Sequence, residues 1–371
     1  MKTSSISKLL PTLLMGSFFI RVAGSFVVRP LLPSRTFFAG ATAAATTKSE
    51  PESTSVNPDA NFRKFNGTVT ILDRSLHHLV VAKPPTVLCH HSDWAGSRSK
   101  KKQDNPEIPM LQRVRNAVGE RVNVVHRLDR GCSGCLLFTF VENSTKKAII
   151  EVDDESDAST ISSSSSLSSS TAIMSDALAD ESSIKTYVAL VRGEGILHGR
   201  DFKKEGWFEV TRPIKNERGI LHNATTFFRF LAGQDSLTQP DRPRASLVLA
   251  RPQTGRWHQI RRHLNGLSHP IVGDSTHGNS KVNREWKERG MPGERTCLHL
   301  ARMQLKPNMA CPEGIDVSCP LPDDMMTLLQ TYLPGVLEEA EPLLEEEGIR
   351  LQSGDENDTT VLPFEIYLQP T

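Results

Sequence analysis

Short apolar runs recur along most of this chain, and each one stops at glycine, proline or a group of polar residues. Runs of this kind are typical of buried strands. They fall within residues 68–83 (two runs), 122–125, 135–140, 184–192, 224–232, 244–252 and 293–307. Helical segments are few and do not alternate with these runs. The sequence therefore predicts an α+β fold with a mixed, mainly antiparallel central sheet flanked by helices and loops.

Two segments have the features of helices. In residues 104–120, four apolar side chains recur at the intervals of one helical face: Met110, Leu111, Val114 and Val118. A second helix is expected over residues 256–267, because Gly255 precedes the segment and Asn265 and Gly266 stand near its end.

Three segments differ from the rest in composition. Residues 1–60 have the character of a targeting presequence followed by an Ala/Thr/Ser/Pro-rich linker, and residues 336–371 form an acidic tail that we expect to be peripheral. Residues 151–183 are rich in serine and acid, and too poor in apolar residues to offset the entropy of ordering, so we expect a flexible insertion. The folded domain is therefore predicted to span residues 61–335, interrupted by this insertion.

The charge is unevenly distributed, although the net charge of the whole chain is only +1. Residues 336–371 carry a net charge of −9, residues 151–181 carry −8, and residues 1–49 contain six bases and no acid. The remainder of the chain has a net charge of +12. A strongly basic folded body favours a polyanionic partner.

The first residues resemble a two-part plastid presequence. Lys2 and Lys8 precede an apolar run that is too short to span a bilayer, and small residues at Ala23 and Gly24 offer a cleavage site. A Ser/Thr/Ala/Arg-rich stretch without acids follows, with Phe26 near its start. We expect an organellar location, with the plastid favoured; a mitochondrial presequence or an ordinary secretory signal is the alternative. No later segment has the composition of a transmembrane helix, so no stable membrane association is expected after processing.

The stretch "HRLDRGCSGCLLF" at residues 126–138 contains a CxxC pair, Cys132 and Cys135. A zinc site needs four ligands, and the other four cysteines form no second pair. A thiol–disulfide pair should open a helix, whereas this pair leads into an apolar strand. We therefore interpret both cysteines as packing residues, and we expect neither a metal nor a cofactor.

Asp129 in the same stretch is the stronger candidate for chemistry. It stands between Arg127 and Arg130 in a glycine-containing loop, and nearby cations favour the ionised carboxylate. A poised carboxylate in a basic protein can act as a nucleophile. A structural ion pair is the alternative for this residue taken alone. Loops held between buried strands often carry function.

A second candidate stretch, "RPQTGRWHQIRRHLNG" at residues 251–266, contains four arginines and no acid. On the expected helix, Trp257 would share a face with Arg261, and His258 would share a face with Arg262. A basic helix with an aromatic residue among its arginines suits phosphate contact and base stacking. A solvated basic face is the alternative.

Together these segments resemble the RluA-type RNA pseudouridine synthases over roughly residues 66–330. "HRLDRGCSG" is similar to the family motif HRLDRxTSG, "KTYVALVRG" to its K-x-Y strand, and "RPQTGRWHQIRRHL" to GRxHQIRxH. "HPIVGDSTHG" is similar to HPIxGDxxYG, and "VVAKPPTVLCHH" to the opening KPxGxxVH. Three features are closer to the TruC-type tRNA branch of the family: the double arginine at Arg261 and Arg262, "GDSTHG" and "NREWKERG". No S4 RNA-binding domain is visible in the sequence, and that branch also lacks one.

The resemblance implies an isomerase that converts a specific uridine of structured RNA to pseudouridine, without metal or cofactor and as a monomer, with tRNA favoured and rRNA the alternative. It implies that Asp129 is the nucleophile, that Tyr187 stacks on the uracil and that Arg261 pairs with the aspartate. Arg127 would fill the space left by the flipped base. Further residues are implied in RNA binding or base flipping: His126, Arg130, Arg256, His258, Gln259 and Arg262.

Four positions depart from the family pattern. Cys132 and Cys135 stand where threonine and leucine are usual, Pro85 stands near a common glycine, and His277 takes the place often held by tyrosine. None of these changes removes a catalytic group, so activity is expected. Two other classes of function stay open: a catalytically silent RNA-binding or chaperone module, and a zinc or redox protein that uses the CxxC pair.

Overall fold

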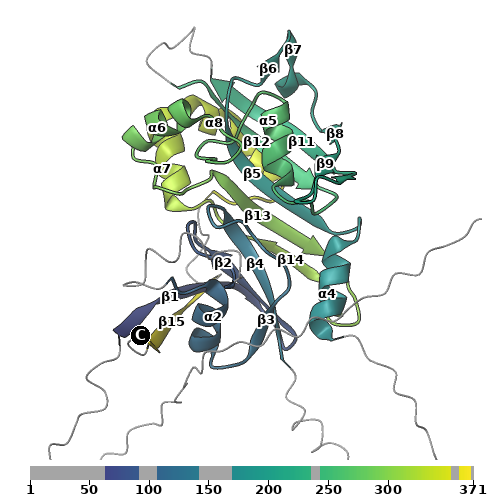
Figure 1. The fold of residues 1–371 in the computed structure, drawn as a ribbon, viewed down its shortest axis with the longest axis vertical. Helices are drawn as coiled ribbons and strands as arrows, with labels where there is room; N and C mark the ends of the chain where they lie inside the picture. Colours follow the sequence, from purple (N-terminus) through teal and green to yellow (C-terminus); the bar gives the residue numbers. More distant parts are fainter. Residues whose placement is uncertain (1–62, 92–106, 142–168, 235–242, 352–358, 369–371) are drawn as a thin grey trace, which may run out of the picture. The chain divides into compact units, whose positions relative to one another are not determined.

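A single mixed sheet of eleven strands runs through the part of the protein that the computed structural model describes (Figure 1). The described residues are 63–91, 107–141, 169–234, 243–351 and 359–368. In spatial order the strands are β15 (Thr360–Leu368), β1 (Arg63–Arg74), β2 (His78–Lys83), β4 (Ser133–Phe140), β13 (Leu298–Leu305), β5 (Ile184–Arg192), β12 (Ala245–Pro252), β11 (Thr225–Gln234) and β8 (Phe208–Thr211). Two more strands pair at the side: β3 (Val122–Val124) with β4, and β14 (Ile315–Ser318) with β13.

Within this sheet, β4 and β13 form the one parallel pair among the described strands. His299 pairs with Ser133, and Leu300 with Gly134. Gly134 has a φ of +119°, and a Cβ atom there would lie 2.3 Å from the carbonyl oxygen of Leu300. Only glycine fits this position, because both the backbone angle and the close approach of β13 exclude a side chain.

The helices lie against the sheet, and two short hairpins stand outside it (Figure 1). The helices are α2 (Met110–Val118), α4 (Ser170–Ala179), α5 (Gln259–Gly266), α6 (Ser280–Glu288), α7 (Asp323–Tyr332) and α8 (Pro334–Glu346), with a 3₁₀ turn at Phe202–Lys204. The hairpins are β6 (Ile196–Leu197) with β7 (Arg200–Asp201), and β9 (Ile214–Lys215) with β10 (Leu221–His222). No helix among these is long and apolar enough to cross a membrane.

Two clusters of buried apolar side chains form the core. One surrounds β5, β11 and β12 together with the helices α5 to α8, and the other surrounds β1, β2, β4 and the helices α2 and α4. Tyr187 on β5 packs against both clusters. The predicted α+β fold with a mixed, mainly antiparallel sheet is confirmed, and so is the helix of α2, whose Met110 and Val114 are buried.

The predicted flexible insertion, residues 151–183, is wrong for its last part. Residues 142–168 lie outside the described residues, but α4 occupies Ser170–Ala179. Met174 and Leu178 are buried, and the Ser169 side chain accepts a hydrogen bond from the Ala172 N–H at the start of the helix. Two apolar residues four positions apart place one face of the helix against the core, although serine and acid dominate the overall composition.

The predicted peripheral tail, residues 336–371, is also wrong. Val336, Ala340 and Leu344 of α8 are buried in the core, and β15 pairs with β1 over nine residue pairs. Glu347 accepts hydrogen bonds from Trp207 Nε1 and Arg229 Nη1. The acids of α8 therefore lie on the outer face of an amphipathic helix and neutralise arginines of the basic body. The predicted presequence and linker, residues 1–60, lie outside the described residues.

Candidate active site

The loop that carries Asp129 is held against the segment that leads into β13. The carbonyl oxygen of Gly131 accepts hydrogen bonds from the Thr296 N–H at 3.0 Å and from Arg295 Nη1 at 3.1 Å. A Cβ atom on Gly131 would lie 2.6 Å from the carbonyl oxygen of Glu294. The close packing of this glycine therefore fixes the backbone two residues after Asp129.

Lys83, at the end of β2, holds the same loop from the other side. Its side chain is 1% exposed, and its Nζ donates to the carbonyl oxygens of Pro84 at 2.9 Å, Arg130 at 3.2 Å and Cys132 at 2.6 Å. Burial lowers the pKa of Lys83 to about 8. This lysine belongs to the "KPP" segment, but its role in positioning the loop was not among the predicted site functions.

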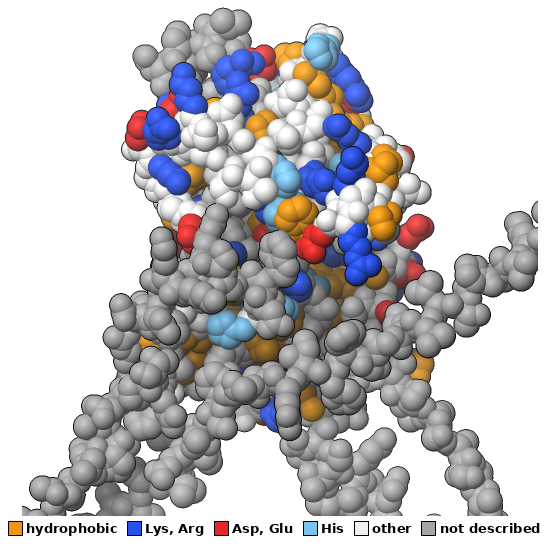
Figure 2. All heavy atoms as spheres, in the orientation of Figure 1, with side chains coloured by type: hydrophobic (Ala, Val, Ile, Leu, Met, Phe, Trp, Pro, Cys, Tyr) orange, Lys and Arg blue, Asp and Glu red, His pale blue; other side chains and the backbone are white. Residues whose placement is uncertain are grey.

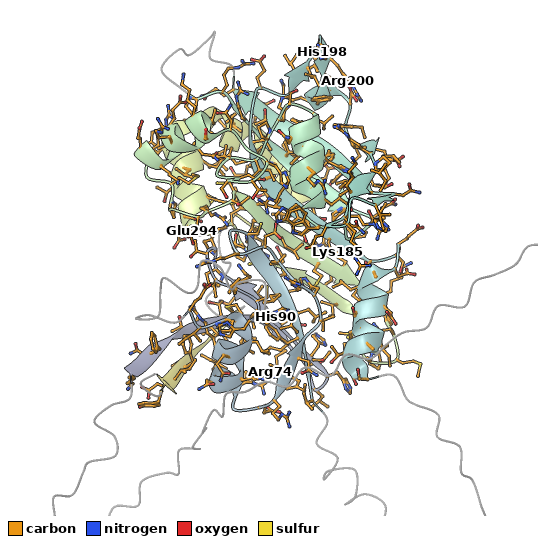
Figure 3. The ribbon with its side chains drawn as sticks, viewed as in Figure 1. Arg74, His90, Lys185, His198, Arg200 and Glu294 are labelled. Atoms are coloured by element: carbon orange, nitrogen blue, oxygen red, sulfur yellow. The ribbon has the colours of Figure 1, made fainter. Side chains whose placement is uncertain are left out.

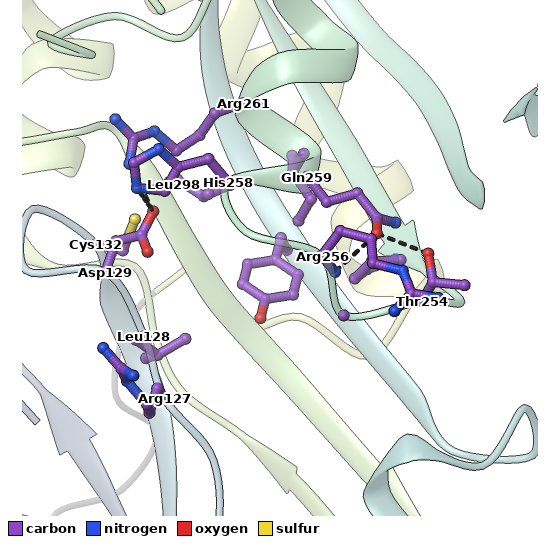
Figure 4. Close-up of a pocket in the computed structure, with 14 residues that line it drawn as sticks. Arg127, Leu128, Asp129, Cys132, Thr254, Arg256, His258, Gln259, Arg261 and Leu298 are labelled. Carbon is purple, nitrogen blue, oxygen red and sulfur yellow. Dashed lines mark hydrogen bonds and ion pairs between the residues drawn. The ribbon is translucent and has the colours of Figure 1, made fainter. Parts of the chain in front are cut away.

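Arg261 is the cation that contacts Asp129 (Figure 4). Its Nη1 lies 2.7 Å from Asp129 Oδ2, while its Nε and Nη2 bind the two carboxylate oxygens of Asp274 at 2.8 and 2.7 Å. Burial alone would lower the pKa of Arg261, but the hydrogen bonds and negative charges of Asp274 and Asp129 raise it above its ordinary value. The guanidinium is therefore a permanent cation with a fixed orientation.

The prediction that the neighbouring arginines hold the Asp129 carboxylate is wrong in its geometry. Arg130 instead forms ion pairs with Glu107 at 2.8 Å and Glu294 at 3.4 Å. Arg127 is exposed and lines the pocket described below. Adjacent residues of an extended loop point in different directions, so nearness in sequence did not bring these charges together.

A stacked group of aromatic rings lies beside the carboxylate. His258 Nε2 is 3.6 Å from Asp129 Oδ2, and His258 Nδ1 is 3.0 Å from His277 Nε2. The ring of Trp257 stacks on His258 with centroids 4.0 Å apart, and 53% of Trp257 is exposed. Burial lowers the pKa of His258 to about 4, so this imidazole is neutral at pH 7.

Helix α5 begins at Gln259, three residues later than predicted. His258 precedes it with a φ of +54°, so Trp257 and His258 lie before the helix rather than on its faces. Arg261 is buried rather than solvated. Arg262 still lies over the Trp257 ring, 5.9 Å from its centroid.

These residues surround a pocket of about 180 Å³ (Figure 4). Its lining includes Asp129, Tyr187, His258, Arg261 and Arg127. The volume is below the usual range for pockets that hold whole drug-sized ligands. Tyr187 is half-buried on β5, and burial raises the pKa of its phenol above the ordinary value, so the hydroxyl keeps its proton.

Two predicted site residues have structural partners instead. His126 Nε2 accepts a hydrogen bond from the Leu137 N–H at 3.2 Å, and burial lowers the pKa of His126 to about 4. The buried amide of Gln259 donates to Thr225 O and Thr226 Oγ1 and accepts from the Arg256 N–H. The contact of His126 joins its segment to β4, and the contacts of Gln259 join the start of α5 to β11. The amide of Gln259 is therefore occupied by protein partners and is not offered to a ligand.

The remaining two predicted contacts lie at the surface near the pocket. Arg256 lines the pocket and donates from Nε to the carbonyl oxygen of Asn223. Arg262 donates from Nη1 to the carbonyl oxygen of Lys215 on β9. Both keep donors for a ligand, since a guanidinium has five N–H groups.

Sequence reasoning missed Asp274, the residue that fixes Arg261. Asp274 is 1% exposed, and its Oδ1 accepts hydrogen bonds from the Thr276 and His277 N–H groups. It follows Gly273, which has a φ of +82°, within "HPIVGDSTHG". The available signal was the position of this acid directly after a glycine, in the segment that resembles the family motif HPIxGDxxYG.

The cysteines of the CxxC pair are packed into the core. Cys132 and Cys135 are 2% and 0% exposed free thiols, and burial raises the pKa of Cys132 to about 12. Burial of this kind makes a thiol unreactive. Cys132 also lines the pocket, where it contributes shape rather than charge.

The chain is similar to several known proteins. The family model for RNA pseudouridylate synthase matches residues 77–148. The tRNA pseudouridine synthase C of Pectobacterium carotovorum subsp. carotovorum is 30% identical over 236 residues, which are 62% of this chain and 53% of that relative. The chain thus spans about half the length of that protein.

A second relative is covered more fully. The tRNA pseudouridine synthase C of Yersinia pestis is 30% identical over 241 residues, 63% of this chain and 80% of that protein. Among solved structures, human RNA Pseudouridylate Synthase Domain Containing 1 is 20% identical with a TM-score of 0.44, covering 72% of this chain and 86% of that one. On its 30% identity to the Yersinia pestis protein, the chain belongs to the RluA-type family of RNA pseudouridine synthases and is similar to the tRNA pseudouridine synthase C proteins.

Proposed function

We propose that this protein isomerises a specific uridine of structured RNA to pseudouridine, with tRNA the favoured substrate. The observation that carries the proposal is the pair of Asp129 and Arg261 inside a small pocket, with Arg261 fixed by Asp274. The reaction breaks the N1–C1′ bond of uridine, forms a C5–C1′ bond and moves the C5 proton, so it needs no external oxidant or reductant.

Asp129 is suited to attack the nucleotide. Its contacts with Arg261 and His258 are both made by Oδ2, so Oδ1 is the oxygen that we propose attacks the substrate. A neutral His258 does not neutralise the carboxylate, while Arg261 stabilises its charged form and orients it. The carboxylate is thus oriented by a fixed cation and partly accessible, as a nucleophile must be.

The pocket supports base flipping. A uridine within a helix or stack must leave its neighbours to reach Asp129 in this pocket, at a cost of a few kcal/mol. Tyr187 in the pocket offers an aromatic face and a protonated hydroxyl to the base. Arg127 is exposed and lines the pocket, which supports the proposal that its side chain occupies the vacated position in the RNA.

The surface around the pocket suits an RNA backbone. Lys and Arg side chains gather over α5 and β9 on the face drawn in Figure 2. Exposed or half-exposed members are Arg212, Lys215, Arg256 and Arg262. Trp257 stands among them with one ring face stacked on His258, which presents the indole as a platform for a flanking base. Cations supply phosphate contacts, and the indole supplies stacking that tolerates any base.

A single assay tests the proposal. The purified chain is incubated with tRNA and rRNA transcripts labelled with tritium at uridine C5, because each turnover releases that tritium to water. Release from tRNA transcripts, lost in Asp129→Asn, is the expected result. Release from rRNA only would support the alternative substrate, and binding without release from either would favour a catalytically silent RNA-binding module.

Location and assembly are further parts of the proposal. The composition of residues 1–60 supports an organellar protein, with the plastid favoured over the mitochondrion. We further propose that the protein acts as a monomer. A fluorescent protein fused to residues 1–60 should enter plastids, and accumulation in mitochondria would replace that assignment. The mass of the purified protein from light scattering tests the monomer.

A further inference from the structure

A second group of polar side chains lies at the end of β2 that is remote from the pocket. His78 begins β2 and Lys83 ends it, so the two residues are separated by roughly 17 Å at about 3.3 Å per residue. Arg74, at the same turn as His78, and Glu294, beside the Asp129 loop, are well separated in Figure 3. The proposed RNA reaction makes no use of this group.

The group joins two turns that are far apart in sequence. His78 Nδ1 lies 3.5 Å from Cys311 Sγ and 3.7 Å from Glu313 Oε1, and the three ligand atoms lie within 4.8 Å of one another. His78 is 1% exposed and Cys311 is 0% exposed, whereas 46% of the Glu313 side chain is exposed. The site is therefore closed on the protein side and open to solvent at the carboxylate.

Asp73 sets the tautomer of the histidine. Asp73 Oδ2 lies 2.6 Å from His78 Nε2, and a carboxylate can only accept, so Nε2 carries the proton. The lone pair of the neutral ring is then on Nδ1, the atom that faces Cys311 and Glu313. A carboxylate that fixes the far nitrogen of a histidine is the usual outer partner of a metal-binding imidazole.

We propose that His78, Cys311 and Glu313 form a zinc site, with Nδ1, Sγ and a carboxylate oxygen as protein ligands. A tetrahedral zinc ion bonds nitrogen and oxygen at about 2.0 Å and sulfur at about 2.3 Å, so its ligands lie roughly 3.3 to 3.6 Å apart. The observed separations of 3.5 and 3.7 Å need only a small shift to match. Imidazole and thiolate favour zinc over magnesium or calcium, which prefer oxygen ligands.

Ser75 offers the competing explanation. Its Oγ lies 2.8 Å from His78 Nδ1, and a hydrogen bond from the hydroxyl satisfies the same lone pair without a metal. In the zinc-bound form this hydroxyl gives up that bond, and a water molecule takes the fourth coordination position. The two explanations differ in one respect that can be measured, which is whether Cys311 is a ligand.

The zinc site would act as a structural clamp. It links the β1–β2 turn to the turn between β13 and β14, and the strands that flank both turns contribute side chains to the apolar cluster around β1, β2 and β4. An ion that binds only the folded chain stabilises that state. The claim is independent of the proposed RNA reaction, so either can fail alone.

Cobalt is the direct probe. The full chain is stripped with a chelator and titrated with Co²⁺, which gives visible bands when tetrahedral and a near-ultraviolet band when bound to thiolate. We expect both bands at one ion per chain, their displacement by Zn²⁺, and loss of the thiolate band in Cys311→Ser. Cys297→Ser is the matched control, since Cys297 is equally buried and lies outside the group, and it should keep both bands.

A variant at an exposed ligand tests the same site without the risk that a substitution at the buried Cys311 causes misfolding. Glu313→Gln changes an exposed side chain and should weaken zinc binding at least tenfold, while Glu339→Gln on the exposed face of α8 should leave it unchanged. Zinc should raise the thermal midpoint of the wild-type chain and not that of Glu313→Gln. Absence of a thiolate band in the wild type, or an equal band in Cys311→Ser, would overturn the site and leave the Ser75 hydrogen bond as the explanation.

Discussion

The position of the Asp129 carboxylate depends on residues that are distant in sequence. Arg261 binds it and Asp274 fixes Arg261. Lys83 fixes the loop backbone through the carbonyl oxygens of Arg130 and Cys132. Each of these contacts restricts the motion of a side chain or of the loop, so the geometry is fixed before the substrate binds. Catalysis by a positioned nucleophile benefits from such preorganisation.

Asp129→Asn should abolish turnover. The amide has almost the shape of the carboxylate but is not nucleophilic, so tritium release should fall below detection while the Kd for RNA changes by no more than a few fold. Asp316→Asn is the control, because Asp316 pairs with Arg302 on the exposed side of β13 and β14. Turnover retained by Asp129→Asn would contradict the assigned nucleophile.

Arg261→Lys tests positioning separately from charge. A lysine keeps the cation but is a point charge that cannot bind two oxygens of Asp274 and one of Asp129 in a fixed fork. We expect kcat to fall by about 100-fold, the cost of a misplacement of about 1 Å, with KM nearly unchanged. A matched fall in RNA affinity would instead indicate that Arg261 binds the substrate.

Trp257→Ala should weaken RNA binding and leave the free energy of unfolding unchanged, because the indole is largely exposed. Stacking of a base on an aromatic ring contributes about 1 to 3 kcal/mol, so the Kd should rise by roughly tenfold and Trp257→Phe should restore most of the affinity. Tyr367→Ala, at an exposed aromatic residue on β15, serves as the control. An unchanged Kd would remove the platform from the proposal.

At the scale of elements, the joint between β4 and β13 supports the active loop. Gly134→Ala would place a methyl group against the Leu300 backbone at a φ that alanine rarely adopts. The free energy of unfolding should fall by about 3 kcal/mol or more, measured in urea. Gly119→Ala is the control: Gly119 also has a positive φ, +71°, but no atom lies within 4 Å of its added Cβ. That variant should lose only about 1 to 2 kcal/mol.

Elements with strong apolar runs could be predicted from sequence, and those with mixed composition could not. The strands β4, β5, β11 and β12 contain the apolar runs from which strands were expected at these places in the chain, whereas their order and pairing in the sheet were not predicted. The helix α4 and the strand β15 were missed because few of their residues face the core. Their burial depends on tertiary contacts that a local pattern does not contain.

At the scale of the whole molecule, neutral buried histidines link stability to pH. Burial lowers the pKa of His126 and of His258 to about 4, below their unfolded value near 6.5. As pH falls from 6.5 towards 4, the unfolded chain binds protons that the folded chain does not, so the free energy of unfolding decreases. The loss should be on the order of 3 kcal/mol for each histidine.

Urea unfolding at pH 7 and pH 4.5 measures this loss. In His126→Gln the amide oxygen can still accept the bond from the Leu137 N–H, but nothing titrates there, so the difference between the two pH values should shrink. An unchanged difference would show that other groups carry the acid sensitivity. His222→Gln at the β9–β10 hairpin is the control, and it should show the same difference between the two pH values as the wild type.

The sequence predicted which residues belong to the candidate site better than it predicted the contacts between them. Asp129, Tyr187 and Arg261 were expected from the motifs, and all three line one pocket. The contact of Arg261 with Asp129 followed only from the family resemblance, because 132 residues separate the two. No pattern in the sequence indicated the group of His78, Cys311 and Glu313, because 233 positions separate His78 from Cys311 along the chain.

The pairing of β1 with β15 has a consequence for biosynthesis. β1 is among the first residues of the folded domain to leave the ribosome, yet its partner at residues 360–368 is made almost 300 residues later. Until then one edge of β1 has open N–H and C=O groups, which are prone to pair with other chains. The sheet therefore cannot close before β15 has left the ribosome, and a chain released before residue 360 would expose an unpaired strand edge to chaperones and proteases.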